Sequence, residues 1–470
     1  KLFPILSAFL LLFSLIEKGQ ATETYRPETS VAGFIQLPGS GRQVYNFNPG
    51  WRFFKGDIHG AESVDFDDRS WTIVSTPHTV ELMPAEASGC RNYQGPAWYR
   101  KHFVLPAETK GKRVLIHFEA AMGKQVLYLN GKRIQEHVGG YLPFTLDLTT
   151  NGIQAGDSCL LAIFVDNSND KSFPPGKPQY TLDFAYHGGI YRDVWMIAKS
   201  PVSITDPLDS QTVAGGGVFV HFDKISEKSA QVYVNTELQN DNQHTETVTV
   251  ETTLTDADGK VIKRTSGKLS LKSGEKKIIR QQIEVKSPKL WSPDAPYLYK
   301  VQSRIKKGNQ SIDGGITRIG IRLAEFRGKD GFWLNGKPFV QLVGVNRHQD
   351  FAYVGNALPN SQQWRDAKRL RDAGCTIIRV AHYPQDPSFM DACDELGMFV
   401  IVATPGWQYW NKDVKFGELV HQNTREMIRR DRNHPSVLMW EPILNETRYP
   451  LDFALKALEI TKEEFPYPGR

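Results

Sequence analysis

Cysteine is scarce in this sequence of 470 residues, which contains only Cys90, Cys159, Cys375 and Cys393. Four widely scattered cysteines are too few for a disulfide framework and have the wrong spacing for a zinc cluster. We expect ordinary thiols, with Cys375 in a buried strand and Cys393 in a helix. The scarcity therefore argues against a small disulfide-stabilised domain.

Long apolar runs are absent except at the very start of the chain. Lys1 precedes an apolar run over Leu2–Ile16, and Gly19-Gln20-Ala21 has the small residues of a cleavage site. Residues 1–21 are therefore predicted to be a secretory signal peptide that sends the protein to the periplasm or out of the cell. The run is too short for a convincing membrane span, and no later stretch is longer.

Blocks of like charge are also absent. The chain has 57 Lys and Arg against 52 Asp and Glu, which gives a formal net charge of +5. Because basic and acidic residues alternate, nothing indicates a nucleic-acid partner. The length is too great for one compact core and indicates about three domains.

The first half of the chain has the pattern of β-structure. After an irregular lead-in over residues 22–45, short β-type runs such as Arg113–Phe118 and Leu160–Val165 alternate with turns, and Asn130-Gly131 marks a hairpin. Residues 46–200 are therefore predicted to form a β-sandwich of the jelly-roll type. Residues 201–322 are again all β and have the size of an immunoglobulin-like β-sandwich.

The pattern changes after Phe332, where strands and helices begin to alternate. This alternation predicts parallel strands, either in an open four-stranded sheet or in the first half of an eight-stranded barrel over residues 323–470. Ser361 is expected to cap the first helix, and Gly374 and Gly397 to end the first two. The predicted elements are strand Phe339–Val345, helix Ser361–Ala373, strand Thr376–Val380, helix Pro387–Leu396, strand Phe399–Ala403, helix Glu418–Arg432, strand Val437–Trp440 and helix Leu451–Phe465.

Polar and aromatic residues follow all four predicted strands. Because parallel strands present functional residues at their carboxyl ends, these side chains are expected to meet at one edge. Glu446, which follows the fourth strand, is the carboxyl group that we expect to carry chemistry. The others are His348, Arg379, His382, Trp407, Trp410 and Asn445.

These residue types suit a sugar. Aromatic faces bind the apolar side of a pyranose ring, while His, Arg and Asn bond to hydroxyls and a carboxylic acid protonates a leaving oxygen. Structural alternatives stay open: His348 and His382 as satisfied core histidines, Arg379 as a salt-bridge partner, and either Trp as core. A metal site is disfavoured because no carboxylate follows the histidines at ligand spacing.

Four motifs together resemble glycoside hydrolase family 2, which contains β-galactosidases, β-glucuronidases and β-mannosidases. They are GVNRHQD at Gly344–Asp350, RVAHYP at Arg379–Pro384, RNHPSVLMW followed by Asn445-Glu446, and GGIYRDVW at Gly188–Trp195. The resemblance implies a jelly-roll sugar-binding domain, an immunoglobulin-like domain and a TIM barrel, of which this chain would hold the first half.

The resemblance also implies roles for individual residues. Glu446 would be the general acid/base, and Asn445 would bond to the sugar 2-hydroxyl. His348, Arg379 and His382 would line the subsite of the departing sugar. Asp183, five residues before Gly188, falls where β-galactosidases place a sugar-contacting Asp from the first domain.

Two features depart from the family pattern. Trp440 and Glu446 enclose five residues where the family usually has four, so Pro442 should mark a strand end or a bulge, and Glu441 becomes an alternative acid. The family's nucleophile, a second Glu, comes from the seventh barrel strand, which lies outside these four units. Residues 403–407 replace the usual β-galactosidase Glu-containing segment, so we expect no magnesium site and no cofactor.

The expected function is that of a secreted, retaining exo-β-glycosidase, with β-galactosidase as the preferred member. The chain on its own is expected to be inactive. A β-glucuronidase of the same family and a non-catalytic carbohydrate-binding protein with a relic half barrel are the alternatives. The expected partner is a carbohydrate substrate, with no nucleic acid and no membrane span; a homo-oligomer stays open.

Overall fold

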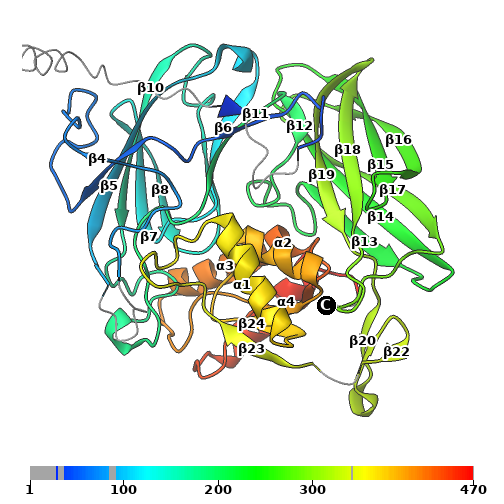
Figure 1. The fold of residues 1–470 in the computed structure, drawn as a ribbon. Helices are drawn as coiled ribbons and strands as arrows, with labels where there is room; N and C mark the ends of the chain where they lie inside the picture. Colours follow the sequence, from blue (N-terminus) through cyan, green and yellow to red (C-terminus); the bar gives the residue numbers. More distant parts are fainter. Residues whose placement is uncertain (1–27, 30–35, 84–91, 340–341, 469–470) are drawn as a thin grey trace, which may run out of the picture.

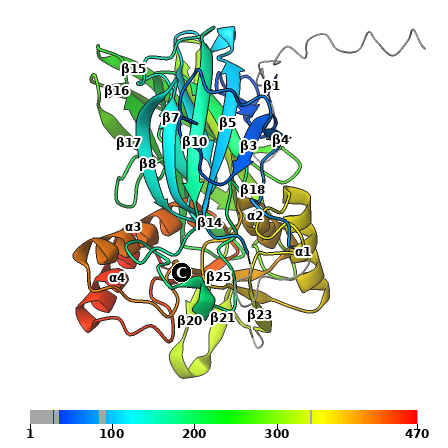
Figure 2. The same cartoon turned by 90° about the vertical axis from the view of Figure 1, so that its left-hand side faces the viewer.

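Two β-sandwiches stand side by side, and a layer of alternating strands and helices lies beneath them (Figure 1, Figure 2). This computed structural model describes residues 28–29, 36–83, 92–339 and 342–468. The arrangement confirms the predicted fold class of two β-sandwiches followed by βα units. The predicted signal peptide over residues 1–21 and Cys90 lie outside the described residues.

The first sandwich has a five-stranded and a six-stranded sheet. Its core is rich in aromatic residues. Four of them are buried in the same apolar cluster: Phe47, Trp51, Tyr99 and Phe118. In spatial order the first sheet is β1 (Glu28–Thr29), β2 (Gln43–Asn46), β11 (Val194–Lys199), β6 (Arg113–Phe118) and β9 (Phe144–Asp147), and the second is β4 (Thr72–Val74), β3 (Trp51–Lys55), β5 (Pro96–Val104), β10 (Ser158–Asp166), β7 (Gly123–Leu129) and β8 (Lys132–Gly139).

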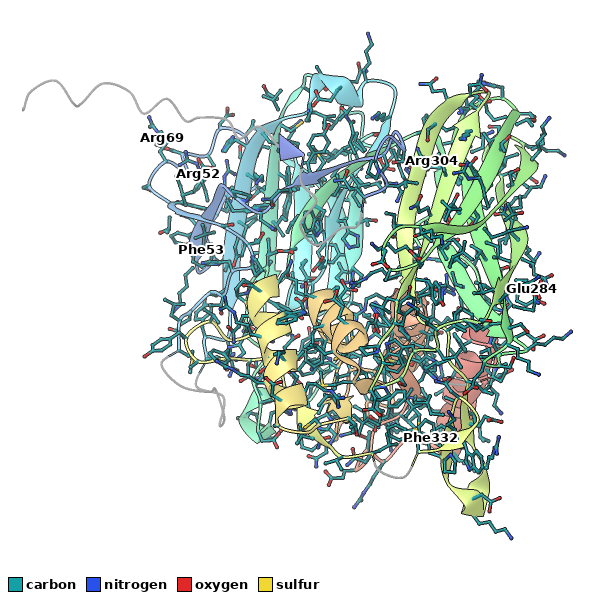
Figure 3. All side chains as sticks on the ribbon, turned by 45° about the vertical axis from the view of Figure 1, so that its right-hand side comes forward. Arg52, Phe53, Arg69, Glu284, Arg304 and Phe332 are labelled. Atoms are coloured by element: carbon teal, nitrogen blue, oxygen red, sulfur yellow. The ribbon has the colours of Figure 1, made fainter. Side chains whose placement is uncertain are left out.

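The second sandwich packs two four-stranded sheets over an aliphatic core that includes Val232, Leu254 and Val301. Arg304 on this sandwich donates to the carbonyl oxygens of Pro38 and Gly39 at 3.0 and 2.8 Å, which fixes the lead-in segment between the sandwiches (Figure 3). One sheet has β12 (Val202–Ile204), β14 (Ser229–Asn240), β13 (Val218–Asp223) and β17 (Lys276–Lys286), and the other has β16 (Val261–Leu271), β15 (Glu246–Thr255), β18 (Tyr299–Lys307) and β19 (Gln310–Ile319).

The third part is a parallel sheet with helices on one face, as the first half of a TIM barrel requires. A small antiparallel sheet of β20 (Ala324–Phe326), β21 (Phe332–Leu334) and β22 (Lys337–Pro338) precedes it. The four parallel strands are neighbours in chain order: β23 (Gly344–Arg347), β24 (Ile377–Val380), β25 (Phe399–Ala403) and β26 (Val437–Glu441). The helices are α1 (Asn360–Asp372), α2 (Pro387–Leu396), α3 (Val414–Asp431) and α4 (Leu451–Glu464).

The ends of α2 show why its predicted bounds are the observed ones. Asp386 accepts a hydrogen bond from the Ser388 backbone N–H at 2.8 Å, and Pro387 occupies the first helical position. Gly397 ends the helix with a φ of 73°, a left-handed conformation that glycine adopts at little cost. The predicted strand Phe399–Ala403 likewise coincides with β25.

The first barrel strand differs from its prediction over Phe339–Val345. The observed β23 begins at Gly344 and ends at Arg347, and residues 340–341 lie outside the described part of the chain. Phe339 packs against Phe332 and Phe399, and Leu342 joins the same apolar cluster. Phe339 and Leu342 therefore pack in an apolar cluster outside the strand, whereas Val343 and Val345 are exposed.

Two helix starts also differ from the predictions. The first helix begins at Asn360 and not at Ser361; the residue before it is Pro359, and no side chain caps it. The third helix begins at Val414, four residues before the predicted Glu418, because Asp413 accepts a hydrogen bond from the Lys415 N–H at 2.9 Å.

The GGIYRDVW motif ties the first sandwich to the parallel sheet. Arg192 is fully buried and donates to the Pro384 carbonyl at 2.9 Å and to the Gln349 side chain at 3.0 Å. Asp193 accepts a hydrogen bond from Asn360, the first residue of α1, at 2.8 Å. The motif therefore fixes how the carboxyl ends of β23 and β24 sit against the jelly-roll domain.

Candidate active site

The register of the parallel sheet brings the predicted strand ends together. Asn346, Arg379, Ile401 and Met439 lie side by side on one face of the four strands. Their in-line neighbours Ile378, Val380, Val400 and Val402 are fully buried beneath the helices on the other face. The loops that follow the strands therefore open at one edge, as expected for parallel strands.

Arg379 on the open face binds two side chains, those of Glu441 and Asn445. Its Nε and Nη2 atoms pair with the Glu441 carboxylate at 2.9 and 2.6 Å, and Nη2 also donates to the Asn445 side-chain oxygen at 2.9 Å. A two-pronged Arg–carboxylate pair is strong and directional. The pair engages Glu441 in a salt bridge, and it orients the amide of Asn445 at the mouth of the sheet.

Glu446 stands beyond this pair and is exposed to solvent. Its backbone has a φ of 61°, a left-handed conformation that costs free energy for a residue with a Cβ. The Glu446 carboxylate accepts a hydrogen bond from the Gln408 side chain, and the Gln408 N–H donates to Thr447 Oγ1 at 2.9 Å. The loop after β25 therefore holds Glu446 in place.

Strand β26 contains an irregularity that lies before Trp440, outside the interval from Trp440 to Glu446. The register of β26 shifts at Leu438, where Val437 and Met439 pair with the adjacent residues Val400 and Ile401. Such a β-bulge inserts one residue and bends the strand. The strand then ends at Glu441, immediately before Pro442, as the sequence predicts.

Two histidines and Trp407 form a compact aromatic group beside the mouth. The His382 ring stacks on Trp407 with centroids 4.7 Å apart, and the His348 ring stacks on Phe184 at 4.6 Å. Burial, with the nearby positive charges of Arg379, His348 and Lys177, lowers the pKa of His382 to about 3. His382 is therefore neutral at ordinary pH and can donate and accept hydrogen bonds.

Two polar atoms of this group have no protein partner. His382 Nδ1 and Trp407 Nε1 are buried, and neither forms a hydrogen bond with any described residue. Buried polar atoms are nearly always paired, so an unpaired donor or acceptor at a strand end calls for an explanation.

The jelly-roll domain contributes residues to the same place. Phe184 is buried against His348, as described above, and its neighbour Asp183 is exposed. The charge of Asp183 raises the pKa of His348 and of Lys177 against the larger lowering by burial, which places the carboxylate near both groups. The structure therefore places Asp183 of the jelly-roll domain near His348 and Lys177, and its contact with a sugar stays a prediction.

Trp410 has different surroundings from the other predicted site residues. Its ring packs against Phe453 at 4.4 Å, Tyr449 at 5.5 Å and Phe416 at 6.0 Å. These contacts place it between the loop after β25 and helices α3 and α4. Trp410 therefore serves as a packing residue in this structure, which was the structural alternative for a Trp.

Lys177 and Gln408 belong to the site and were not predicted. Lys177 donates to the Gln408 side chain and lies 4.3 Å above the Trp407 ring. Lys177 occurs in a stretch rich in proline and glycine at residues 174–178, a pattern that indicates only a loop. Gln408 follows Trp407 directly. Its position after the third strand could therefore have identified it as a candidate site residue.

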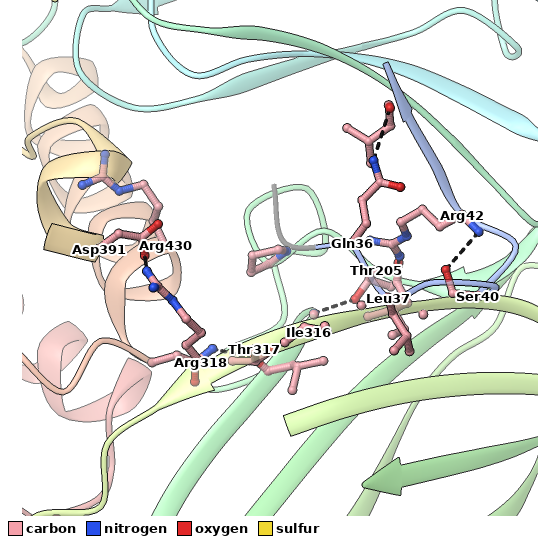
Figure 4. Close-up of a pocket in the computed structure, with 18 of the residues that line it drawn as sticks. Gln36, Leu37, Ser40, Arg42, Thr205, Ile316, Thr317, Arg318, Asp391 and Arg430 are labelled. Atoms are coloured by element: carbon pink, nitrogen blue, oxygen red, sulfur yellow. Dashed lines mark hydrogen bonds and ion pairs between the residues drawn. The ribbon is translucent and has the colours of Figure 1, made fainter. Parts of the chain in front are cut away.

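A second polar cluster lies at the opposite end of the sheet. Asp391, Asp394 and His434 come within 4.8 Å of one another, but Arg318 pairs with Asp391 at 2.5 Å and His434 with Asp394 at 2.6 Å. They border a cavity of about 350 Å³ where the lead-in, the second sandwich and the barrel segment meet (Figure 4). The pair between Arg318 of the second sandwich and Asp391 of α2 therefore joins these two domains.

Searches for known proteins agree with this architecture. Residues 61–201 match the family model for the glycosyl hydrolases family 2 sugar binding domain, residues 216–322 match the glycosyl hydrolases family 2 model, and residues 326–463 match the TIM barrel domain of that family. In the described residues, no helix has the length and apolar character that crossing a membrane requires.

Individual relatives divide between two activities. A β-galactosidase of Thermoanaerobacter pseudethanolicus is 36% identical over 89% of this chain and 54% of its own length, and a β-glucuronidase of Formosa agariphila is 32% identical over 86% and 42%. A solved structure of Bacteroides uniformis β-glucuronidase 2, bound covalently to cyclophellitol-6-carboxylate aziridine, has a TM-score of 0.81 at 30% identity and covers 90% of this chain and 52% of its own. The chain spans about half the length of these relatives. With three consecutive domain matches and these relatives, the chain belongs to glycoside hydrolase family 2.

Proposed function

We propose that this chain forms part of a retaining exo-β-glycosidase that removes terminal β-linked sugars, with β-galactosides as the preferred substrates. The supporting observation is the contrast between two carboxylates at the end of β26. Glu441 is paired with Arg379, whereas Glu446 is exposed, accepts a hydrogen bond from the neutral Gln408 side chain, and stands beside the aromatic group. Glu446 is therefore the carboxyl group available to a substrate.

In this mechanism Glu446 protonates the glycosidic oxygen as its bond to the sugar breaks. A second carboxylate, which the family takes from the seventh barrel strand, would form the covalent glycosyl-enzyme at about 5–5.5 Å from Glu446. Glu446 then removes a proton from the attacking water. Asn445, held by Arg379, would bond to the 2-hydroxyl of the sugar.

A β-glucuronidase is the second candidate, and one observation favours it. A sugar acid needs a cationic group near its carboxylate, and the Lys177 ammonium lies beside Trp407 and Gln408 at the mouth. The nearby carboxylates of Asp183 and Glu446 offset this charge, which is why the galactoside is preferred.

The test compares 4-nitrophenyl β-galactoside with 4-nitrophenyl β-glucuronide, using the longest product of the gene that encodes this chain. We expect kcat/KM to be higher for the galactoside. A higher kcat/KM for the glucuronide would show that the enzyme is a β-glucuronidase and not a β-galactosidase. Binding of galactose without turnover of either substrate would support the non-catalytic carbohydrate-binding alternative.

Export is part of the same proposal, supported by the apolar run at residues 2–16 and the small residues at 19–21. Expression with the leader in a bacterium should give a periplasmic or extracellular protein that begins near Thr22. An N-terminal sequence that still contains residues 1–21 would contradict export by cleavage.

A further inference from the structure

A loop of the jelly-roll domain docks onto the loop that follows β25. Asn411 Nδ2 and Tyr409 Oη donate to the Lys171 carbonyl at 2.7 and 3.4 Å. Gly176 approaches the Tyr409 ring so closely that an added Cβ would lie 2.5 Å from a ring carbon. The contact is therefore tight and fixes the next residue, Lys177, relative to the barrel segment.

Lys177 directs its ammonium group toward the strand ends. Its residue is only 9% exposed, its Nζ lies 4.3 Å from the centre of the Trp407 ring, and it donates to Gln408 Oε1. The Tyr186 hydroxyl donates to the Lys177 carbonyl at 3.1 Å and so fixes the backbone as well. A buried Lys held by a ring, an amide and its own backbone has little freedom.

Gln408 connects Lys177 to Glu446. Its side-chain oxygen accepts from Lys177, its side-chain nitrogen donates to Glu446, and its backbone N–H donates to Thr447 Oγ1 at 2.9 Å. Gln408 and Glu446 both have left-handed backbones, with φ of 54° and 61°. Such conformations persist only where the surroundings hold them in place.

We propose that Lys177 of the jelly-roll domain is a positioning residue for Glu446, and that it acts through the Gln408 side chain. The inference rests on the proposed function, because it concerns the group proposed as the general acid. Lys177 orients the Gln408 amide so that its nitrogen faces Glu446 and its oxygen faces Lys177. The first domain therefore sets the geometry of the acid on the fourth barrel strand.

The charges agree with this connection. Burial lowers the pKa of Lys177, while the carboxylates of Asp183 and Glu446 each raise it. The ammonium and the Glu446 carboxylate therefore affect one another across Gln408. Removing the Glu446 charge should therefore lower the pKa of Lys177 further, because a carboxylate favours the charged form of a nearby ammonium group.

The first test uses the 470-residue chain and requires no catalysis. Lysines are labelled with 13C at the ε carbon, and the Lys177 signal, identified by its loss in Lys177→Met, is titrated with pH. We expect Lys177 to titrate below ordinary lysines, and Glu446→Gln to lower its pKa further. The matched variant Glu441→Gln, which neutralises the other Glu at the end of β26, should leave it unchanged. No response to Glu446→Gln, or an equal response to both variants, would overturn the proposal.

The second test measures hydrolysis by the longest product of the gene. Lys177→Met keeps an apolar stem over Trp407 but removes the ammonium. We expect kcat to fall about 10- to 100-fold for substrates with poor leaving groups, and much less for dinitrophenyl glycosides, with little change in KM. Lys177→Arg should restore part of the rate, while Lys412→Met, at an exposed lysine in the same barrel loop, should have no effect.

The outcomes separate the two proposals. If the wild-type protein hydrolyses no glycoside, the proposed function fails and the Lys177 titration alone decides whether the two residues are coupled. If the wild type is active and Lys177→Met has equal losses on both kinds of substrate, the proposed function stands and the positioning role is wrong.

Discussion

Arg379 holds two groups at once on the open face of the parallel sheet. It forms a two-pronged pair with Glu441, whose side chain is 19% exposed, and bonds to the Asn445 amide. The pair is only partly solvated, so it depends on both partners. Removing one partner leaves the other charge without compensation in a poorly solvated place.

We predict that Arg379→Met destabilises the chain by about 2 kcal/mol, because charged hydrogen bonds are lost and Glu441 stays behind without a cation. The double variant Arg379→Met/Glu441→Gln should recover part of the loss. Urea unfolding followed by tryptophan fluorescence measures both. A double variant as unstable as the single one would contradict this account.

Arg69 offers a control for the same kind of substitution. It pairs with Asp67 on the surface of the first sandwich, and its side chain is 75% exposed (Figure 3). Surface pairs contribute little to stability because water and salt screen them. Arg69→Met should leave the unfolding midpoint unchanged.

The sequence identified Glu446 as the candidate acid but left Glu441 open for a physical reason. Counting residues from Trp440 cannot show which of the two carboxylates is already paired. In the structure Arg379 is paired with Glu441, whereas Glu446 accepts a hydrogen bond from Gln408. Both facts depend on contacts between segments that are distant in sequence.

At the scale of single elements, the docked loop at Gly176 depends on close packing as well as on backbone conformation. Gly176 has a φ of 73°, and an added Cβ would lie 2.5–2.9 Å from carbons of Tyr409 and Phe416. Gly111 has nearly the same φ, 75°, but an added Cβ would meet nothing within 4 Å. The two glycines therefore separate backbone strain from overpacking.

We predict that Gly176→Ala lowers the melting temperature more than Gly111→Ala does. Both variants carry a backbone cost of about 1 kcal/mol, and Gly176→Ala adds an overpacking cost of about 1–3 kcal/mol. Differential scanning calorimetry on the two variants makes the comparison. Equal shifts would show that the loop is not tightly docked.

Helix boundaries were predicted best where local residues determine them. Asp386, Pro387 and Gly397 mark α2, and each acts within one turn of the helix. Ser361 was a poor guide because α1 begins at Asn360, whose side chain bonds to Asp193 of another domain. Phe339 was misassigned to a strand because hydrophobicity reports burial and does not specify the partner.

At the scale of the whole molecule, a buried carboxylate joins the jelly-roll domain to the barrel segment. Asp193 accepts hydrogen bonds from Asn48 at 3.0 Å and from Asn360 at 2.8 Å. Burial, with the charge of Asp386, raises the pKa of Asp193 to about 6. The folded protein therefore binds this proton more tightly than the unfolded chain does.

We predict that this interface weakens as the pH rises from about 4 to about 6. Below that window Asp193 is protonated in both states; within it, the unfolded chain releases the proton first, so stability falls with rising pH. Asp193→Asn cannot titrate. The melting temperature of the variant minus that of the wild type should therefore rise from pH 4 to pH 6 and stay constant above pH 6. A constant difference from pH 4 to 8 would contradict the prediction.

The surface variant Asp67→Asn is the control for this measurement. The hydrogen bond from Arg69 lowers the pKa of Asp67, so that carboxyl is already ionised at pH 4. Its difference from the wild type should therefore stay level from pH 4 to 8.

We predict that the 470-residue chain alone hydrolyses no glycoside. A retaining reaction needs two carboxyl groups about 5–5.5 Å apart, and Arg379 already pairs with Glu441, the other carboxylate at the end of β26. The assay is release of nitrophenol from 4-nitrophenyl β-galactoside, with the longest gene product as the active reference. Turnover by the purified 470-residue chain would show that it holds a complete site.

Domain packing could not be predicted from the sequence, although the order of the domains could. The short strands before residue 323 and the βα alternation after Phe332 were visible in local patterns. Lys177, Asp193 and Phe184 act across the junction between the first and third parts of the chain, and no local pattern specifies their partners.

The most direct test of the central claim is azide rescue of Glu446→Gln in the longest gene product. The variant keeps the shape of the side chain but loses both proton transfers, so hydrolysis of unactivated disaccharides should fall about 10²- to 10⁴-fold. With a dinitrophenyl β-galactoside the first step needs little acid, and azide needs no base for the second. We expect azide to restore part of the rate and to give a β-galactosyl azide. If the variant instead hydrolyses unactivated disaccharides at the wild-type rate, Glu446 is not the acid, and Glu441 becomes the residue to test.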